Sequence, residues 1–191
     1  MRRDDDSRLD GRLHAASTAG DVSEIRLALQ AGAGVESKGD ARGETPLMNA
    51  SFSGHVSAMR MLLEALAAVD VKDNSGATAL MHASVQGHDG AMRVLLEAGA
   101  AVDLIDNDTQ TALIIASMGG HTRAVRLLLE AGSAVNAKDN NGMNALTAAI
   151  GTDNLDVTRL LGGRRTTATR IIPLWLRCSG CWPCTGAGAR L

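Results

Sequence analysis

The sequence contains few aromatic side chains and few cysteines for its 191 residues. Tyrosine is absent, and the only aromatic residues are Phe52, Trp175 and Trp182. Three large rings cannot centre one compact core, because aromatic side chains supply much of the area buried in most cores. All three cysteines lie after residue 177, so no disulfide framework holds the rest of the chain together. The body of the protein must therefore fold by burying small and aliphatic side chains.

Long apolar runs and a strong net charge are also missing. No stretch approaches the ~20 apolar residues of a membrane helix, and the N-terminal segment MRRDDDSRLDGR lacks the apolar core of a signal peptide. We therefore expect a cytoplasmic protein, with the nucleus as the alternative compartment. The formal net charge of −2 lacks the surplus of lysine and arginine that phosphate contacts need, which argues against nucleic acid as a partner.

Motifs of the common enzyme classes are absent as well. The sequence has no phosphate-binding loop, no Gly-x-Ser-x-Gly motif and no zinc-protease helix. The acidic run 4–6 has no partner carboxylate or histidine at motif spacing, and it is typical of a solvated charge cluster. We therefore expect no enzymatic activity and no cofactor.

Charge divides the chain into two parts. Residues 1–163 carry 14 Lys or Arg and 21 Asp or Glu, a net charge of −7. Residues 164–191 carry five Arg and no acidic residue, a net charge of +5. We predict a folded domain over 1–163, followed by a flexible or poorly ordered basic tail over 164–191.

A period of 33 residues organises the first part. Three short motifs, Gly-His, Leu-Leu-Glu and Thr-x-Leu, each recur on this period. Their first residues are Gly54, Gly87 and Gly120, then Leu62, Leu95 and Leu128, and then Thr45, Thr78 and Thr111. Three independent motifs on one period indicate a tandem repeat.

The third unit shows the parts of one repeat. The segment 73–76 is a turn cluster, Thr78 is placed to cap a short helix, and Gly87 ends it. A second predicted helix runs from about residue 88 to residue 98 and carries one apolar stripe. Two short helices with one stripe each cannot bury themselves, so each unit must stack on its neighbours.

These units resemble the ankyrin repeat. The resemblance is carried by the segment GETPL at 43–47, by the Gly-His break between two helices, and by the Leu-Leu and Gly-Ala elements that follow. It covers about residues 9–163. It implies an all-α solenoid of stacked helix–turn–helix repeats joined by β-turn loops. It also implies a non-catalytic scaffold or adaptor that binds a partner protein through a concave groove.

We count five units, at 9–38, 39–72, 73–105, 106–138 and 139–163. Leu66 and Thr109 stand where the family has glycine, which predicts strained turns at both positions. The fifth unit meets Gly162 and Gly163 where Leu and Glu are expected, so we predict a break inside its second helix. An abrupt change of composition after this point is typical of an out-of-frame or truncated ending, and equally of a functional segment. We expect a monomer, apart from association at the uncapped C-terminal end.

The variable positions of the period are the candidate partner-binding residues. Phe52, Val85 and Met118 lie 33 residues apart and would form an apolar stripe across several layers. The loop candidates are Arg42, Glu44, Lys72, Ala77, Ile105, Gln110, Lys138 and Met143. They predict a groove with an apolar centre and a charged rim, in which Phe52, Met118 and Ile105 supply the main apolar contacts. The sequence leaves open whether the stripe lies in the groove or is half-buried in the core.

Two alternative functions concern the tail. Cys178, Cys181 and Cys184 have a spacing that suits one metal ion or a redox role, although the tail offers no fourth ligand. Its five Arg and two Trp would suit a tether to nucleic acid or to an anionic membrane.

The histidines are interpreted as structural. His55, His88 and His121 recur with the period at the start of the second helix, where an imidazole can bond the backbone of a neighbouring loop. His14 and His82 occur singly, and we assign both a structural role.

Overall fold

The computed structural model describes residues 2–39 and 41–163, with side chains from residue 7 onward. This part of the chain forms ten α helices and no strand, which confirms the predicted all-α class. The helices are α1 (Arg2–Ala19), α2 (Val22–Gln30), α3 (Pro46–Ser53), α4 (Val56–Glu64), α5 (Ala79–Gln86), α6 (Asp89–Glu97), α7 (Ala112–Met118), α8 (Thr122–Glu130), α9 (Ala145–Gly151) and α10 (Leu155–Gly162).

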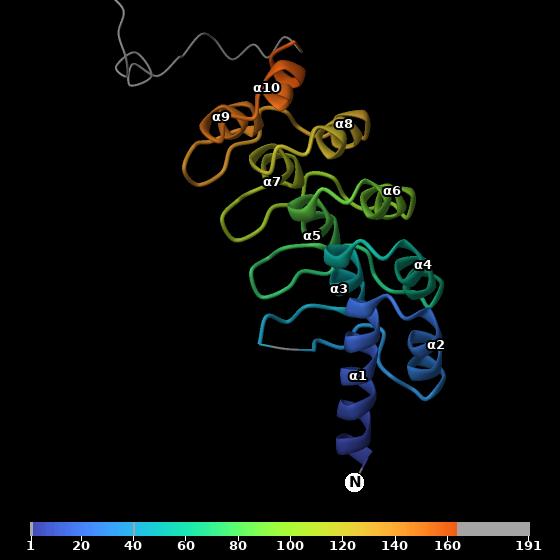
Figure 1. The fold of residues 1–191 in the computed structure, drawn as a ribbon. Helices are drawn as coiled ribbons and strands as arrows, with labels where there is room; N and C mark the ends of the chain where they lie inside the picture. Colours follow the sequence, from blue (N-terminus) through green and yellow to red (C-terminus); the bar gives the residue numbers. More distant parts are fainter. Residues whose placement is uncertain (1, 40, 164–191) are drawn as a thin grey trace, which may run out of the picture.

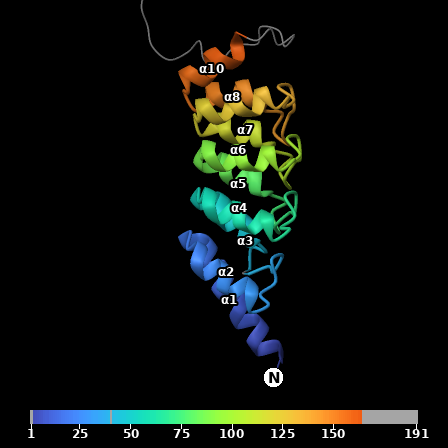
Figure 2. The ribbon, with the colours of Figure 1, turned by 90° about the vertical axis from the view of Figure 1, so that its right-hand side faces the viewer.

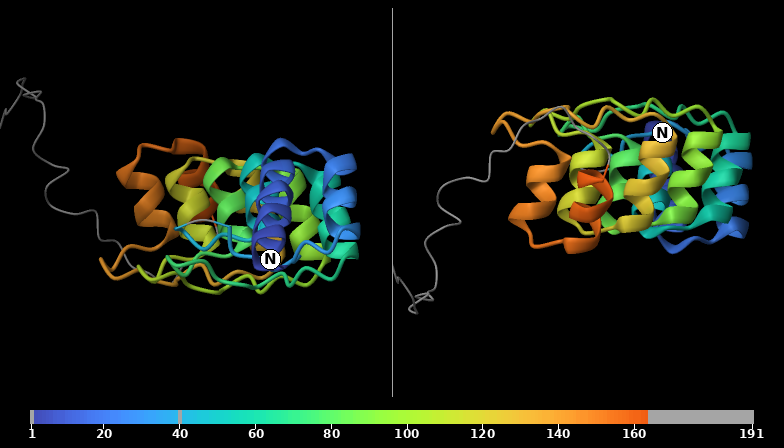
Figure 3. Two further views of the ribbon diagram at one scale, coloured as in Figure 1. Left: turned by 90° about the horizontal axis from the view of Figure 1, so that it is seen from below. Right: turned by 90° about the horizontal axis from the view of Figure 1, so that it is seen from above.

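The helices pair in chain order, and the five pairs stack along one axis in the described part of the chain (Figures 1 and 2). Helices α1, α3, α5, α7 and α9 contact one another in sequence and form an inner layer. Helices α2, α4, α6, α8 and α10 form the outer layer in the same way. The long connecting loops gather along one side of the stack (Figure 3). This arrangement is the predicted solenoid.

One aliphatic core runs through the whole stack. It extends from Leu13 in α1 to Leu161 in α10, and among the described residues it consists of Leu, Met, Ile, Val and Ala. Fully buried alanines recur on the inner helices, at Ala50, Ala83, Ala116 and Ala149. Because alanine is small, these helices approach closely, which explains how a chain with few aromatic rings builds a core.

Two of the three periodic threonines cap their helices, whereas Thr78 begins α5 without a side-chain capping hydrogen bond. The side-chain oxygens of Thr45 and Thr111 accept hydrogen bonds from the backbone N–H three residues later. Gly87 ends α5 with a left-handed φ of 67°, a conformation that glycine adopts at little cost. The boundaries of α5 and α6 agree with the predicted ones to within a residue or so at each end.

Two helix ends differ from the predictions. Helix α1 begins at Arg2, several residues before the first predicted unit. The prediction missed this part of the helix because the polar segment ahead of Leu9 carries no apolar stripe. Helix α10 is not broken: it runs to Gly162 and has 8 residues, compared with 9 in α8. Its side chains Val157 and Leu161 are fully buried, which holds the last helix against α8 and α9 despite the two glycines.

The predicted strained turns are confirmed. Leu66 has a φ of 66° and Thr109 a φ of 60°, both in the left-handed region that favours glycine. Asp153 also has a left-handed φ, of 58°, which the sequence pattern did not predict.

Two of the three periodic histidines bond the backbone of the neighbouring repeat, as interpreted from the sequence. His55 Nε2 donates to the Thr18 carbonyl at 3.1 Å, and His121 Nε2 donates to the Val85 carbonyl at 3.0 Å. In the fifth repeat Asn154 takes this position, and its Nδ2 donates to the Met118 carbonyl at 3.0 Å. Each bond joins the start of an outer helix to the end of the inner helix in the preceding repeat.

The equivalent glycine one repeat earlier leaves room for each histidine ring, which gives a stability prediction. A Cβ on Gly87 would collide with the His121 ring, whereas a Cβ on Gly99 would have no described atom within 4 Å. Both glycines have a positive φ, 67° and 87°, so alanine is strained at either site. We expect Gly87→Ala to lower the free energy of unfolding by about 1 kcal/mol or more beyond the effect of Gly99→Ala, because it also displaces a hydrogen-bonded ring.

Urea unfolding followed by circular dichroism of the two variants measures this difference. Equal losses would contradict a specific role for the Gly87–His121 contact.

Candidate functional site

The apolar stripe lies at the surface of the inner layer. Phe52 is 44% exposed and Val85 is 47% exposed, while Met118 is half-buried. These residues lie at or near the C-terminal ends of α3, α5 and α7, one on each successive layer. None of the three residues belongs to the buried core cluster.

A pocket of about 570 Å³ forms around this stripe. Its apolar lining comes from α3, α5 and α7 and from the loop before α5, and the residues are Phe52, Ala77, Met81, Val85, Ile115 and Met118. Polar side chains of His82, Asp106 and Gln110 also line it. The pocket thus spans three layers and combines an apolar floor with a few polar groups, as ligand and partner sites commonly do.

Sequence reasoning missed part of this lining. Met81, His82 and Ile115 were not among the predicted site residues, yet they line the pocket. His82 and Ile115 each lie three residues before a stripe residue, so they share its helix face. Helical spacing applied to the stripe would have found both.

A second pocket of about 470 Å³ adjoins the first on the N-terminal side. Phe52 and His82 line both pockets, and Arg42 and Glu44 line the second. The groove is therefore continuous from the first repeat to the fourth, with the charged residues toward its N-terminal end.

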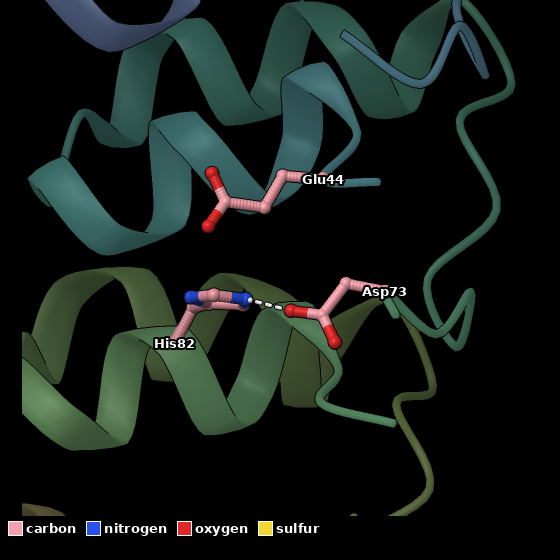
Figure 4. Close-up of side chains that lie close together, drawn as sticks. All are labelled: Glu44, Asp73 and His82. Carbon is pink, nitrogen blue, oxygen red and sulfur yellow. Dashed lines mark hydrogen bonds and ion pairs between the residues drawn. The ribbon is translucent and has the colours of Figure 1, made fainter. Parts of the chain in front are cut away.

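A polar cluster of Glu44, Asp73 and His82 lies where the two pockets meet. The His82 Nε2 is 3.0 Å from the Asp73 Oδ2. Each of the three residues has one side-chain oxygen or nitrogen that could bind a metal ion, and these three atoms lie within 4.8 Å of one another. Glu44 comes from the loop before α3 and points toward His82 on the next layer (Figure 4). Sequence analysis did not predict this cluster, because it joins two repeats.

Hydrogen bonds account for the cluster. Asp73 Oδ1 accepts from Ser75 N, Ser75 Oγ and Ala77 N at 2.8, 2.7 and 2.9 Å, which closes the turn. Glu44 forms an ion pair with Arg42 at 3.3 Å. The three residues could hold a divalent cation only by giving up the His82–Asp73 bond, so the cluster is best described as a polar wall of the groove.

The Asp73 carboxyl is held in its ionised form. Burial alone would raise its pKa, but the hydrogen bonds from Ser75, Ala77 and His82 outweigh burial and lower the pKa below its ordinary value. Because folding lowers this pKa, the ionised carboxylate stabilises the fold at pH values above the unfolded-state pKa. That contribution is lost as the pH falls through the folded-state pKa.

This sign gives a pH prediction for Asp73→Asn. At pH 7 the variant is expected to be less stable than the wild type by about 1–3 kcal/mol, since the carboxylate hydrogen bonds are charge-assisted. The difference should shrink as the pH falls below about 4, where aspartate begins to protonate in the unfolded chain. Urea unfolding at a series of pH values measures it, with Asp108→Asn in the next loop as the matched control. A difference that is constant with pH would contradict this account.

The remaining predicted site residues lie outside the two pockets. Lys72 Nζ donates to the Ile105 carbonyl at 2.6 Å, and the Ile105 side chain is exposed. Lys138 is exposed and Met143 is half-buried. These residues lie on successive loops between repeats. Cys178, Cys181 and Cys184 and the whole segment 164–191 lie outside the described residues.

The fold and the groove define a helical repeat protein with an elongated surface of adjoining pockets. A family model for ankyrin repeats in three copies matches residues 13–106 and 92–169. The chain therefore belongs to the ankyrin repeat family, as the sequence resemblance implied. A comparison with curated proteins gives no significant match.

Membership of this family sets the general class of function. Ankyrin repeats are generally protein–protein interaction modules, and the family is typically non-catalytic. Within residues 2–39 and 41–163, no helix is both long and apolar enough to cross a membrane.

Proposed function

We propose that this chain is a non-catalytic scaffold or adaptor that binds a partner protein in the groove along α3, α5 and α7. The observation that carries the proposal is the single pocket that Phe52, Val85 and Met118 line across three layers. Phe52 and Val85 are more than two-fifths exposed, so their apolar surface is left in contact with water. Removing such surface from water is energetically favourable. A partner that inserts an apolar side chain here would bury them.

The surrounding residues suit a rim that sets orientation. Arg42 and Glu44 lie at the N-terminal end of the groove, and Gln110 lies beside the apolar floor. Lys72, Ile105, Lys138 and Met143 extend the same side along the loops. In such an interface the central apolar contacts supply most of the affinity, while peripheral polar groups select the partner and fix its register.

Site-specific photo-cross-linking tests the location of the binding surface. A photoreactive phenylalanine analogue placed at Val85 reports on the groove, and the same analogue at Arg93, exposed on α6 of the same repeat, is the matched control. We expect a defined covalent adduct with a cellular protein from position 85 and not from position 93. Adducts of the same protein from both positions, or from position 93 alone, would contradict binding in the groove.

A further inference from the structure

The last repeat ends in an open face that the preceding repeats do not show. In the fourth repeat Leu113, Ile114 and Ser117 are buried, and α7 there contacts α9 of the next layer. The residues one period later are Leu146, Thr147 and Ile150. Leu146 is only half-buried, Thr147 is exposed and Ile150 is 43% exposed. Together with Leu155, which is 60% exposed, these residues form what we call the C-terminal end face.

The composition of this face differs from that of the internal layers. Four serines, Ser17, Ser51, Ser84 and Ser117, occupy the position of Ile150 in the preceding repeats, and all four are fully buried. Each donates its Oγ to the carbonyl four residues earlier, at 2.6–2.7 Å. A serine bonded in this way lets the next helix approach closely. Isoleucine is too large for such a close helix–helix contact, so a further repeat of the same kind would not pack well on this face. The isoleucine also adds apolar surface, which favours an apolar covering segment.

Leu155 is a second exposed apolar residue on this face. It begins α10 at the position where Thr122 begins α8. Thr122 is partly covered by the fifth repeat, whereas Leu155 is exposed. The first two outer helices carry valine at this position, Val22 and Val56, so the full change from small polar to large apolar occurs at Ile150, while Leu155 adds a second exposed apolar side chain to the face.

The chain itself supplies a segment of matching chemistry. Residues 164–191 follow Gly163 directly and contain the apolar run 171–176, IIPLWL. The seven residues between Gly163 and this run can span up to about 23 Å when extended, whereas α10 is only about 12 Å long. The charges are also of opposite sign at Asp153: the segment has five Arg and no acidic residue, while Asp153 borders the end face and Asp156 beside it pairs with Arg159 at 3.9 Å.

We propose that residues 164–191 of this chain cover the C-terminal end face, with the run 171–176 packed on Ile150 and Leu155. The segment would then act as a cap for the solenoid, so that the final layer does not fray. This inference is independent of binding in the groove.

Tryptophan fluorescence tests this proposal on the full chain, because Trp175 and Trp182 are its only tryptophans and both lie in the segment. The variant Ile150→Ser with Leu155→Thr carries the residues of the fourth repeat, so the array should still fold. We expect the wild type to show blue-shifted emission and weak quenching by acrylamide. In the variant the emission should shift to the red and the quenching constant should rise severalfold, with unchanged helicity.

The control is Leu27→Ser, which removes an exposed leucine from α2 at the opposite end of the stack. Tryptophans that are equally accessible in the wild type and in urea would overturn the proposal. The proposal would also be overturned if the tryptophans stayed shielded from acrylamide in the double variant as they do in Leu27→Ser, because the segment would then pack elsewhere. Shielding that depends on protein concentration, with a dimer in sedimentation, would assign the cover to a second copy and would also overturn it.

A second measurement covers the case in which the double variant unfolds. Leu155→Cys places a thiol on the end face, and Leu27→Cys places one at the opposite end of the stack. Under mild oxidation by diamide, we expect an intrachain disulfide between residue 155 and one of Cys178, Cys181 and Cys184, and none from residue 27. Absence of the first disulfide, read by peptide mass mapping, would overturn the proposal.

Discussion

Replacing Phe52 and Met118 together by alanine is expected to weaken partner binding by about 30- to 1,000-fold. This range corresponds to about 2–4 kcal/mol, the loss that a few buried apolar anchors commonly produce in an interface. The two side chains come from layers two repeats apart and line one pocket, so a partner that fills the pocket contacts both. Neither residue belongs to the buried core, and the fold should survive their loss.

Titration calorimetry against the purified partner, with helicity followed by circular dichroism, makes this measurement. Arg93→Ala on the outer layer is the matched control and should leave the affinity unchanged. Loss of helicity in the double variant would show that the stripe supports the fold. Unchanged affinity with an intact fold would move the binding surface away from the pocket.

Replacing Leu95 by alanine is expected to have the largest effect on stability, about 2–5 kcal/mol. Leu95 is fully buried in α6 of the third repeat, which contacts α4 on one side and α8 on the other. In a stacked array each repeat is held by its neighbours, so a cavity in a middle layer weakens both interfaces.

Leu161 offers a matched comparison for Leu95. It occupies the same position of the period in α10 and is also fully buried. Since α10 has a described neighbour in the outer layer on one side only, Leu161→Ala should cost less than Leu95→Ala. Urea unfolding of both variants tests the difference. A larger loss at Leu161 would mean that the last repeat is held by more than α8 and α9.

The sequence predicted the fold well because the same physical parts recur on one period. Thr78 and Gly87 mark the ends of α5, and the same marks recur one repeat earlier and later, so each boundary was supported several times over. Where repetition fails, the prediction failed too. The start of α1 has no apolar stripe, and Gly162 remains helical because Leu161 anchors the last turn in the core.

The candidate site was predictable only in part. The stripe of Phe52, Val85 and Met118 could be read from the period, since one position repeats an apolar residue. The cluster of Glu44, Asp73 and His82 could not, because it depends on a contact between layers and on a hydrogen bond across nine residues. The partner cannot be read from the repeat pattern, because the exposed positions of the proposed groove carry different residues in successive repeats.

Hydrogen–deuterium exchange of the chain, with and without its bound partner, tests the central claim most directly. We expect slower exchange in the C-terminal halves of α3, α5 and α7 and in the loops 73–77 and 106–110, with no change in α4, α6 and α8. Protection confined to the outer helices, or to residues 164–191, would contradict binding in the groove.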